Sequence, residues 1–123
     1  MILVDTSVWI DHLRTRENDL VTALSRLLVL CHPFVIGELA CGSIAHRGSV
    51  LQLLGELPAA PVAAHEEVME MIARRALHGR GIGWVDAHLL SSTLLMPGCR
   101  LWTRDRRLAE LADELSIRHA SSE

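Results

Sequence analysis

Four acidic residues stand where the chain could perform metal-assisted chemistry on a phosphate. Asp5 closes the apolar run Ile2 to Val4, which has the length and β-branched character of a buried strand. Asp105 follows a second strand-like run, Arg100 to Thr103. Glu38 and Asp86 lie near the beginnings of predicted helices, on faces that carry apolar neighbours. Carboxylates crowded together repel one another, and Mg²⁺ or Mn²⁺ with oxygen ligands would relieve that repulsion. Such a cation binds phosphate oxygens and activates water, which is the chemistry of phosphodiester cleavage.

Each acid also has a structural explanation. Asp105 could cap the helix that follows it, and Asp86 could serve only the dipole of its helix. Glu38 could pair with an arginine. Asp5 is the hardest of the four to explain without a function, because it ends a buried strand and ligands of open α/β sheets bind beyond such ends.

The elements that position these acids alternate between strand and helix. Predicted strands cover residues 2–4, 28–31, 60–62, 100–103 and 116–119, and amphipathic helical patterns fill the stretches between them. This alternation predicts an α/β fold with βα units and a mostly parallel sheet. Asp5 and Asp105 should then lie at the same edge of the sheet.

Length and composition limit the classes of protein. The 123 residues fit one domain spanning 1–123, and a hydrophobic content of 50% predicts that another chain covers some apolar surface, as in a homodimer. All 12 basic residues are arginines, so mechanisms that use a lysine are excluded. The net charge of −3 argues against nonspecific coating of nucleic acid but not against a nuclease with bound cations.

The sequence also favours a cytoplasmic protein with no membrane span. No signal peptide is recognisable, and the longest uncharged run, Ala87 to Cys99, is too short to cross a bilayer. Three cysteines without a CxxC pair are expected to be buried thiols. The three tryptophans are expected in the core, namely Trp9, Trp84 and Trp102.

Four motifs in order complete the pattern: ILVDTSVWIDHLR, VIGEL, GIGWVDAHLL and LWTRDRRL. Each contributes one acid, and together they span nearly the whole chain. In this combination the sequence resembles the PIN-domain ribonucleases, and more narrowly the VapC-type toxins of toxin–antitoxin pairs.

This resemblance implies a site and a fold. The acidic quartet of the family falls on Asp5, Glu38, Asp86 and Asp105, which would hold Mg²⁺ or Mn²⁺ and activate water for hydrolysis of RNA. Its hydroxyl positions fall on Thr6 or Ser7 and on Thr103. The family fold is a three-layer arrangement with a five-stranded parallel sheet, and its members are typically homodimers inhibited by a cognate antitoxin. Gly37 departs from the hydroxyl or other polar residue expected before Glu38 in many relatives.

Arginines are the candidates for contact with RNA, because their planar fork suits phosphate. One group surrounds Asp105 and another precedes the glycine-rich turn, although some of these side chains could simply be solvated. The first group is Arg100, Arg104, Arg106 and Arg107, and the second is Arg74, Arg75 and Arg80.

Two other functions compete with a nuclease. Aspartyl-phosphate chemistry at Asp5 would need a lysine and, in phosphatases, a second acid at the position of Ser7, so the sequence disfavours it. A non-catalytic PIN-like module that binds RNA or protein remains the alternative, and the presence of all four acids counts against it.

Overall fold

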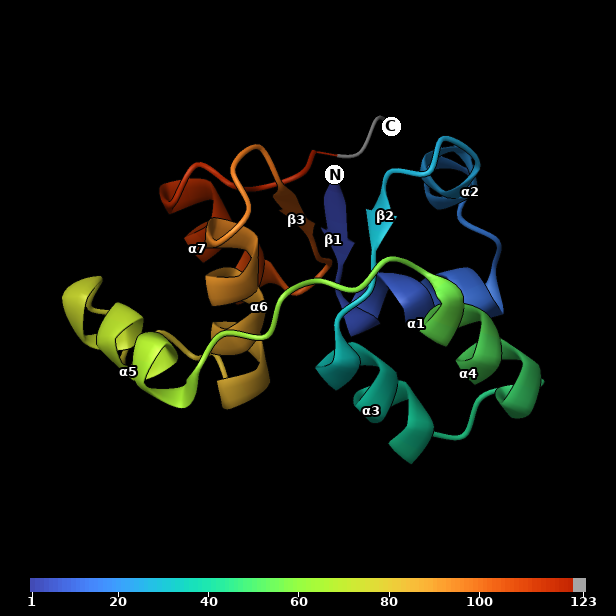
Figure 1. The fold of residues 1–123 in the computed structure, drawn as a ribbon, viewed down its shortest axis with the longest axis horizontal. Coiled ribbons are helices and arrows are strands. Elements are labelled where there is room, and N and C mark those ends of the chain that lie inside the picture. Colours follow the sequence, from blue (N-terminus) through green and yellow to red (C-terminus); the bar gives the residue numbers. More distant parts are fainter. Residues whose placement is uncertain (121–123) are drawn as a thin grey trace.

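The sheet is parallel throughout, and its central strand is the first one in the chain. The computed structural model describes residues 1–120, with strands β1 (Ile2–Val4), β2 (Val29–Leu30) and β3 (Arg100–Trp102). The order is β2-β1-β3, and β1 pairs in parallel with both neighbours (Figure 1). Leu3 and Val4 have no exposed surface, as is typical of a strand covered on both faces. The predicted α/β fold with a parallel sheet is confirmed.

Helices flank this sheet on either side in the view of Figure 1, with α5, α6 and α7 on the left and α1 to α4 on the right. Helices α1 and α3 pack together, as do α3 with α4 and α5 with α6, while α6 also packs against β3. The helices of the described residues are α1 (Thr6–Arg14), α2 (Asn18–Ser25), α3 (Pro33–Cys41), α4 (Arg47–Glu56), α5 (His65–Arg74), α6 (Trp84–Leu94) and α7 (Arg106–Glu114).

The expectation of five strands is wrong for residues 1–120, which form three. The two predicted edge strands each shrink to a single parallel bridge, Ala59 with Cys31 and Arg118 with Leu101. On the first edge, Pro58 and Pro61 have no N–H groups to donate, so the ladder cannot continue. On the second, Ser116 adopts a left-handed backbone with φ 61°, so the extended stretch cannot begin before Ile117.

Two expectations about burial need correction. Cys31 and Cys99 are buried as predicted, but the Cys41 thiol is exposed at the end of α3. Trp9 and Trp102 belong to the core, whereas Trp84 keeps 40% of its surface exposed at the start of α6. None of the helices within residues 1–120 combines the length and hydrophobicity needed to cross a membrane.

The core around β3 provides a test of this packing. Leu101 is fully buried between β1 and the chain near Arg118. We predict that Leu101→Ala lowers the free energy of unfolding by about 2–5 kcal/mol, because it leaves a cavity that the neighbours fill only in part. The measurement is urea unfolding followed by circular dichroism.

Leu53→Ala is the matched control, because Leu53 is 63% exposed on α4. That change should cost less than about 0.5 kcal/mol. Equal losses for the two variants would contradict the placement of β3 in the core.

Candidate active site

Asp5 lies at the carboxyl end of the central strand, and two hydroxyls fix its side chain. It is 6% exposed, occupies the position before the first turn of α1, and its own N–H donates to the Trp102 carbonyl at 2.9 Å. Ser7 Oγ and Thr103 Oγ1 each donate to Asp5 Oδ2 at 2.7 Å. Hydrogen bonds of this kind stabilise a buried carboxylate as the anion, and neither of them uses Oδ1.

Backbone N–H groups determine which way these hydroxyls point. Arg104 N–H donates to Ser7 Oγ at 3.0 Å, and Asp105 N–H donates to Thr103 Oγ1 at 3.0 Å. Each hydroxyl oxygen therefore accepts from the backbone and directs its own hydrogen toward Asp5. The turn after β3 thus holds the same acid that closes β1.

Glu38 reaches the site from α3, but not from the buried face that the sequence predicted. The core side of α3 carries Val35 and Leu39, and Glu38 itself is exposed. Thr6 Oγ1 donates to Glu38 Oε1 at 2.6 Å, which links α3 to the first residue of α1. Thr6 and Ser7, which follow Asp5 in the sequence, therefore serve different acids.

Asp86 is half-buried in the first turn of α6. Its Oδ2 accepts the Gly83 N–H at 3.1 Å, so Asp86 caps the first turn of its own helix. The structural explanation from the sequence was a charge at this end of the helix dipole, and the cap adds to it. The preceding loop is tied to α7 by an ion pair between Arg80 and Glu114. Arg107 packs against Gly81, where φ is 82° and an added Cβ would lie 2.5 Å from the guanidinium.

Asp105 likewise combines a cap with a place beside the other acids. Its Oδ1 accepts the Leu108 N–H at 3.0 Å, at the start of α7, and the residue is exposed. The prediction that Asp105 could cap this helix is confirmed. The cap leaves Asp105 near the other acids, because its negative charge contributes to the raised pKa of Asp86.

Asp86 lies close enough to the other three acids for their charges to act on it. Burial raises the pKa of this carboxyl, the Gly83 N–H opposes that rise, and the negative charges of Asp5, Asp105 and Glu38 raise it further. None of these acids is in a salt bridge within residues 1–120. Their repulsion is therefore not relieved by a protein cation.

Carboxylates and hydroxyls form the hard-oxygen donor set that Mg²⁺ and Mn²⁺ prefer, so the residues fit such an ion chemically. As they stand, however, no three His, Cys, Asp or Glu side chains of residues 1–120 are arranged to hold one. Asp86 and Asp105 are turned toward helix N–H groups and Glu38 toward Thr6. Joint coordination would require some of these side chains to rotate.

Most of the predicted RNA-binding arginines have structural partners. Arg100 donates to the carbonyls of Ser116 and Arg118, and Arg104 forms ion pairs with Asp11 and Glu17. Arg107 packs on Gly81, as described above. Arg106 lines an open hollow of about 490 Å³ beside Thr103, together with Arg104, Arg118 and His119.

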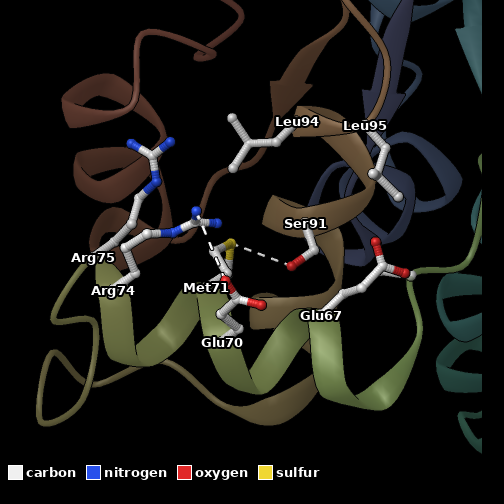
Figure 2. A pocket seen from close by; sticks show the side chains of 9 residues that line it. Glu67, Glu70, Met71, Arg74, Arg75, Ser91, Leu94 and Leu95 are labelled. Carbon is white, nitrogen blue, oxygen red and sulfur yellow. Dashed lines mark hydrogen bonds and ion pairs between the residues drawn. The ribbon is translucent and has the colours of Figure 1, made fainter.

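Arg74 and Arg75 lie elsewhere. Figure 2 shows them on α5, lining a hollow of about 210 Å³ that also includes Ser91 and Leu94 of α6. Arg74 pairs with Glu70 one turn away, at 3.9 Å on an exposed surface. None of the four acids lines this hollow, so these two arginines are not part of the site.

His32 is a structural residue that the sequence reading did not single out. It is fully buried after β2, its Nδ1 accepts the Phe34 N–H at 3.0 Å, and Nε2 therefore donates to Ser92 Oγ at 3.1 Å. This bond joins the start of α3 to α6, and so helps to place Glu38 relative to Asp86. A histidine directly before a proline at the first turn of a helix was the available signal.

Comparison with known proteins shows the family of the chain. The profile described as PIN domain matches residues 2–114. The chain belongs to the PIN-domain family. This PIN domain is 53% identical over 117 residues to proteins named Ribonuclease VapC32 from Mycobacterium tuberculosis, strains CDC 1551 / Oshkosh and ATCC 25618 / H37Rv. The aligned part covers 95% of this chain and 94% of each relative, so the resemblance to VapC-type PIN ribonucleases is confirmed.

The buried His32 predicts a dependence of stability on pH. Burial, and secondarily the neighbouring His88, lowers the pKa of His32 from its usual 6.5 to about 4. Between these pH values the unfolded chain binds the additional proton, so stability falls as the pH drops from 6.5 to 4. We expect a loss of at most about 3 kcal/mol from this group.

The measurement is urea unfolding from pH 7 to pH 4 for the parent and for His32→Asn, which keeps a helix-capping side chain. The stability difference between them should shrink as the pH falls, since only the parent loses this contribution. His78→Asn, a change at an exposed histidine, should leave the pH dependence unaltered. Parallel curves for the parent and His32→Asn would contradict the account.

Proposed function

We propose that this PIN domain is a metal-dependent endoribonuclease that hydrolyses RNA phosphodiester bonds and acts as the toxin of a toxin–antitoxin pair. The observation that carries the proposal is the arrangement of acids where β1 and β3 end: Ser7 and Thr103 hold Asp5, and Thr6 holds Glu38. Burial raises the pKa of Asp86, and the charges of Asp5, Asp105 and Glu38 raise it further. The 53% identical relatives are named Ribonuclease VapC32, and this name supports RNA cleavage.

We infer that Asp5, Glu38, Asp86 and Asp105 hold Mg²⁺ or Mn²⁺. A cation bound there would neutralise the cluster, polarise a phosphoryl oxygen and lower the pKa of water for attack on phosphorus. Asp5 contributes a fixed anion, because Ser7 and Thr103 lock its Oδ2. Glu38 and Asp86 contribute carboxylates held by Thr6 and by the Gly83 N–H.

RNA would approach this edge of the sheet beside α7. Arg106 and its neighbours in the adjacent hollow are the candidates for contact with the phosphate backbone. Arg100 and Arg107 would contribute mainly by holding the surrounding chain, in view of the partners described above. Arg104 lines the hollow, but it is engaged by Asp11 and Glu17.

We also propose a cognate antitoxin, a homodimer and a cytoplasmic location. The VapC name of the relatives supports the antitoxin. Exposed apolar side chains, including Leu27 at 82% and Leu53 at 63%, support contact with further chains.

The nuclease is tested by cleavage of a total RNA pool with purified, antitoxin-free protein. Discrete cuts should appear with Mn²⁺ or Mg²⁺, disappear with chelator, and fall by roughly 100-fold or more in Asp5→Asn, because that variant loses an anion at the centre of the cluster. Glu56→Gln, a change at an exposed acid on α4, is the control and should cut like the parent.

Two outcomes would overturn the assignment. Asp5→Asn that cuts like the parent would remove Asp5 from the site. A folded parent that binds RNA and Mn²⁺ but cuts nothing would favour the alternative of a non-catalytic PIN-like module.

Thr103 provides a finer test, because it positions Asp5 without being one of the acids. Thr103→Val removes the donor to Asp5 Oδ2 and the acceptor for the Asp105 N–H, so we expect cleavage to fall roughly 10- to 100-fold. Thr103→Ser keeps the hydroxyl and should retain most of the activity. The proposed role of the Thr103 hydroxyl is to position Asp5 for the metal. A higher Mn²⁺ concentration should therefore partly restore cleavage by Thr103→Val. A Val variant as active as the Ser variant would refute the role of this bond.

A further inference from the structure

An open hollow of about 640 Å³ lies between α3 and the start of α6, directly beside the acid cluster. Its lining includes Pro33, Phe34, Gly37, Glu38, Trp84 and Val85, and we call it the Trp84 hollow. Glu38 is shared between this hollow and the candidate active site. The remaining side chains of that lining are uncharged and largely apolar.

Trp84 is held in place although it is exposed. The His88 ring packs edge-on against the indole, with centroids 4.8 Å apart and an angle of 85° between the planes. The His65 ring lies at 5.1 Å from another element, α5, and His88 also packs on Phe34 at 4.7 Å. A large aromatic ring that is ordered by two neighbours and still 40% exposed is prepared for contact with a further planar group.

Gly37 leaves room for such a group. Glycine is a poor helix former, yet Gly37 lies within α3. A Cβ built at Gly37 would meet nothing within 4 Å, so neither close packing nor a left-handed backbone accounts for the glycine. Its consequence is open space in the lining of the Trp84 hollow, one residue from Glu38.

We infer that the Trp84 hollow receives one unpaired base of single-stranded RNA, stacked on Trp84, next to the phosphate held at the acid cluster. The inference rests on the proposed function and adds a subsite for one base, which can reach the Trp84 ring only when it is splayed from a helix. A base is flat and neutral, so it suits an aromatic lining beside Glu38, whereas a phosphate there would be repelled. The shared residue Glu38 makes the hollow continuous with the site, which favours the substrate strand over a second protein.

Binding can be measured without cleavage by placing every variant in an Asp5→Asn background. The probe is a fluorescein-labelled, single-stranded 12-nucleotide oligoadenylate with Mg²⁺, and the comparison is the same oligonucleotide paired with its complement. Stacking predicts tighter binding of the single strand, and roughly 5- to 100-fold weaker binding after Trp84→Leu. Trp84→Phe keeps a ring and should stay within a few-fold of the background protein.

Met69→Ala removes another exposed apolar side chain, on α5, and should leave the affinity unchanged. Equal affinity of Trp84→Leu and Trp84→Phe would overturn the inference, since general hydrophobic contact does not need a ring. Sedimentation of the same variants identifies the competing occupant. A dimer that Trp84→Leu dissociates, with RNA affinity unchanged, would also overturn the inference and assign the hollow to a second copy of the chain.

Fluorescence quenching tests the hollow without a substitution at Trp84. Trp9 and Trp102 are buried, so collisional quenching by acrylamide reports mainly on Trp84. Oligoadenylate should protect this fluorescence, and bound RNA that gives no protection would contradict stacking. Oligoadenylate could protect the fluorescence while the parent protein, which has Asp5, cuts no RNA. That result would refute the proposed nuclease but would still support the base-binding site.

Discussion

The parallel pairing of β1 with both of its neighbours is the constraint on which the site depends. It brings the end of β1 and the end of β3 to one edge of the sheet, although Asp5 and Thr103 are separated by 98 positions. The hydrogen bond from Thr103 to Asp5 is possible only because both strands run in the same direction. Helices α1 and α7 begin directly after these strand ends, so their first turns border the same edge.

The same arrangement concentrates negative charge. Burying a carboxylate is unfavourable unless it is paired or hydrogen-bonded, which applies to the buried Asp5 and the half-buried Asp86. Hydroxyl or backbone donors bind each of the four acids. Burial still raises the pKa of Asp86, and repulsion from the other three acids adds to that rise. The four carboxylates are held separately, each by its own donors. A cation shared between them would offset their mutual repulsion by coordinating their oxygens. Natural proteins accept such local conflicts at functional sites and offset them by packing elsewhere.

The parallel α/β fold and the four candidate acids could be predicted from the sequence, because both depend on the order of short motifs along the chain. A strand-like run followed by an acid indicated both Asp5 and Asp105, and helix faces with apolar neighbours indicated Glu38 and Asp86 before the family motifs did. The direction of the hydroxyl bonds could not be predicted, since it depends on backbone N–H groups of the turn after β3.

The errors arose where tertiary context decides the outcome. The sequence pattern of α3 predicted that Phe34 and Glu38 lie on the helix face that packs inward. The face that packs on the core carries Val35 and Leu39 instead. Trp84 was expected in the core because of its residue type, yet its place in the first turn of α6 leaves it exposed. The first edge strand was lost because Pro58 and Pro61 have no N–H groups for pairing. The second was shortened by the left-handed backbone of Ser116.

Mn²⁺ binding, followed by the electron paramagnetic resonance of the free ion, tests most directly whether the four acids form one cation site. The account predicts saturable binding to the wild-type chain that weakens roughly tenfold or more in Glu38→Gln and in Asp86→Asn. Glu56→Gln, an exposed acid on α4, should bind like the wild type. Weak, unsaturable binding that is the same in every variant would contradict the account, because the acids would then be separate hydrogen-bonded carboxylates and not one site.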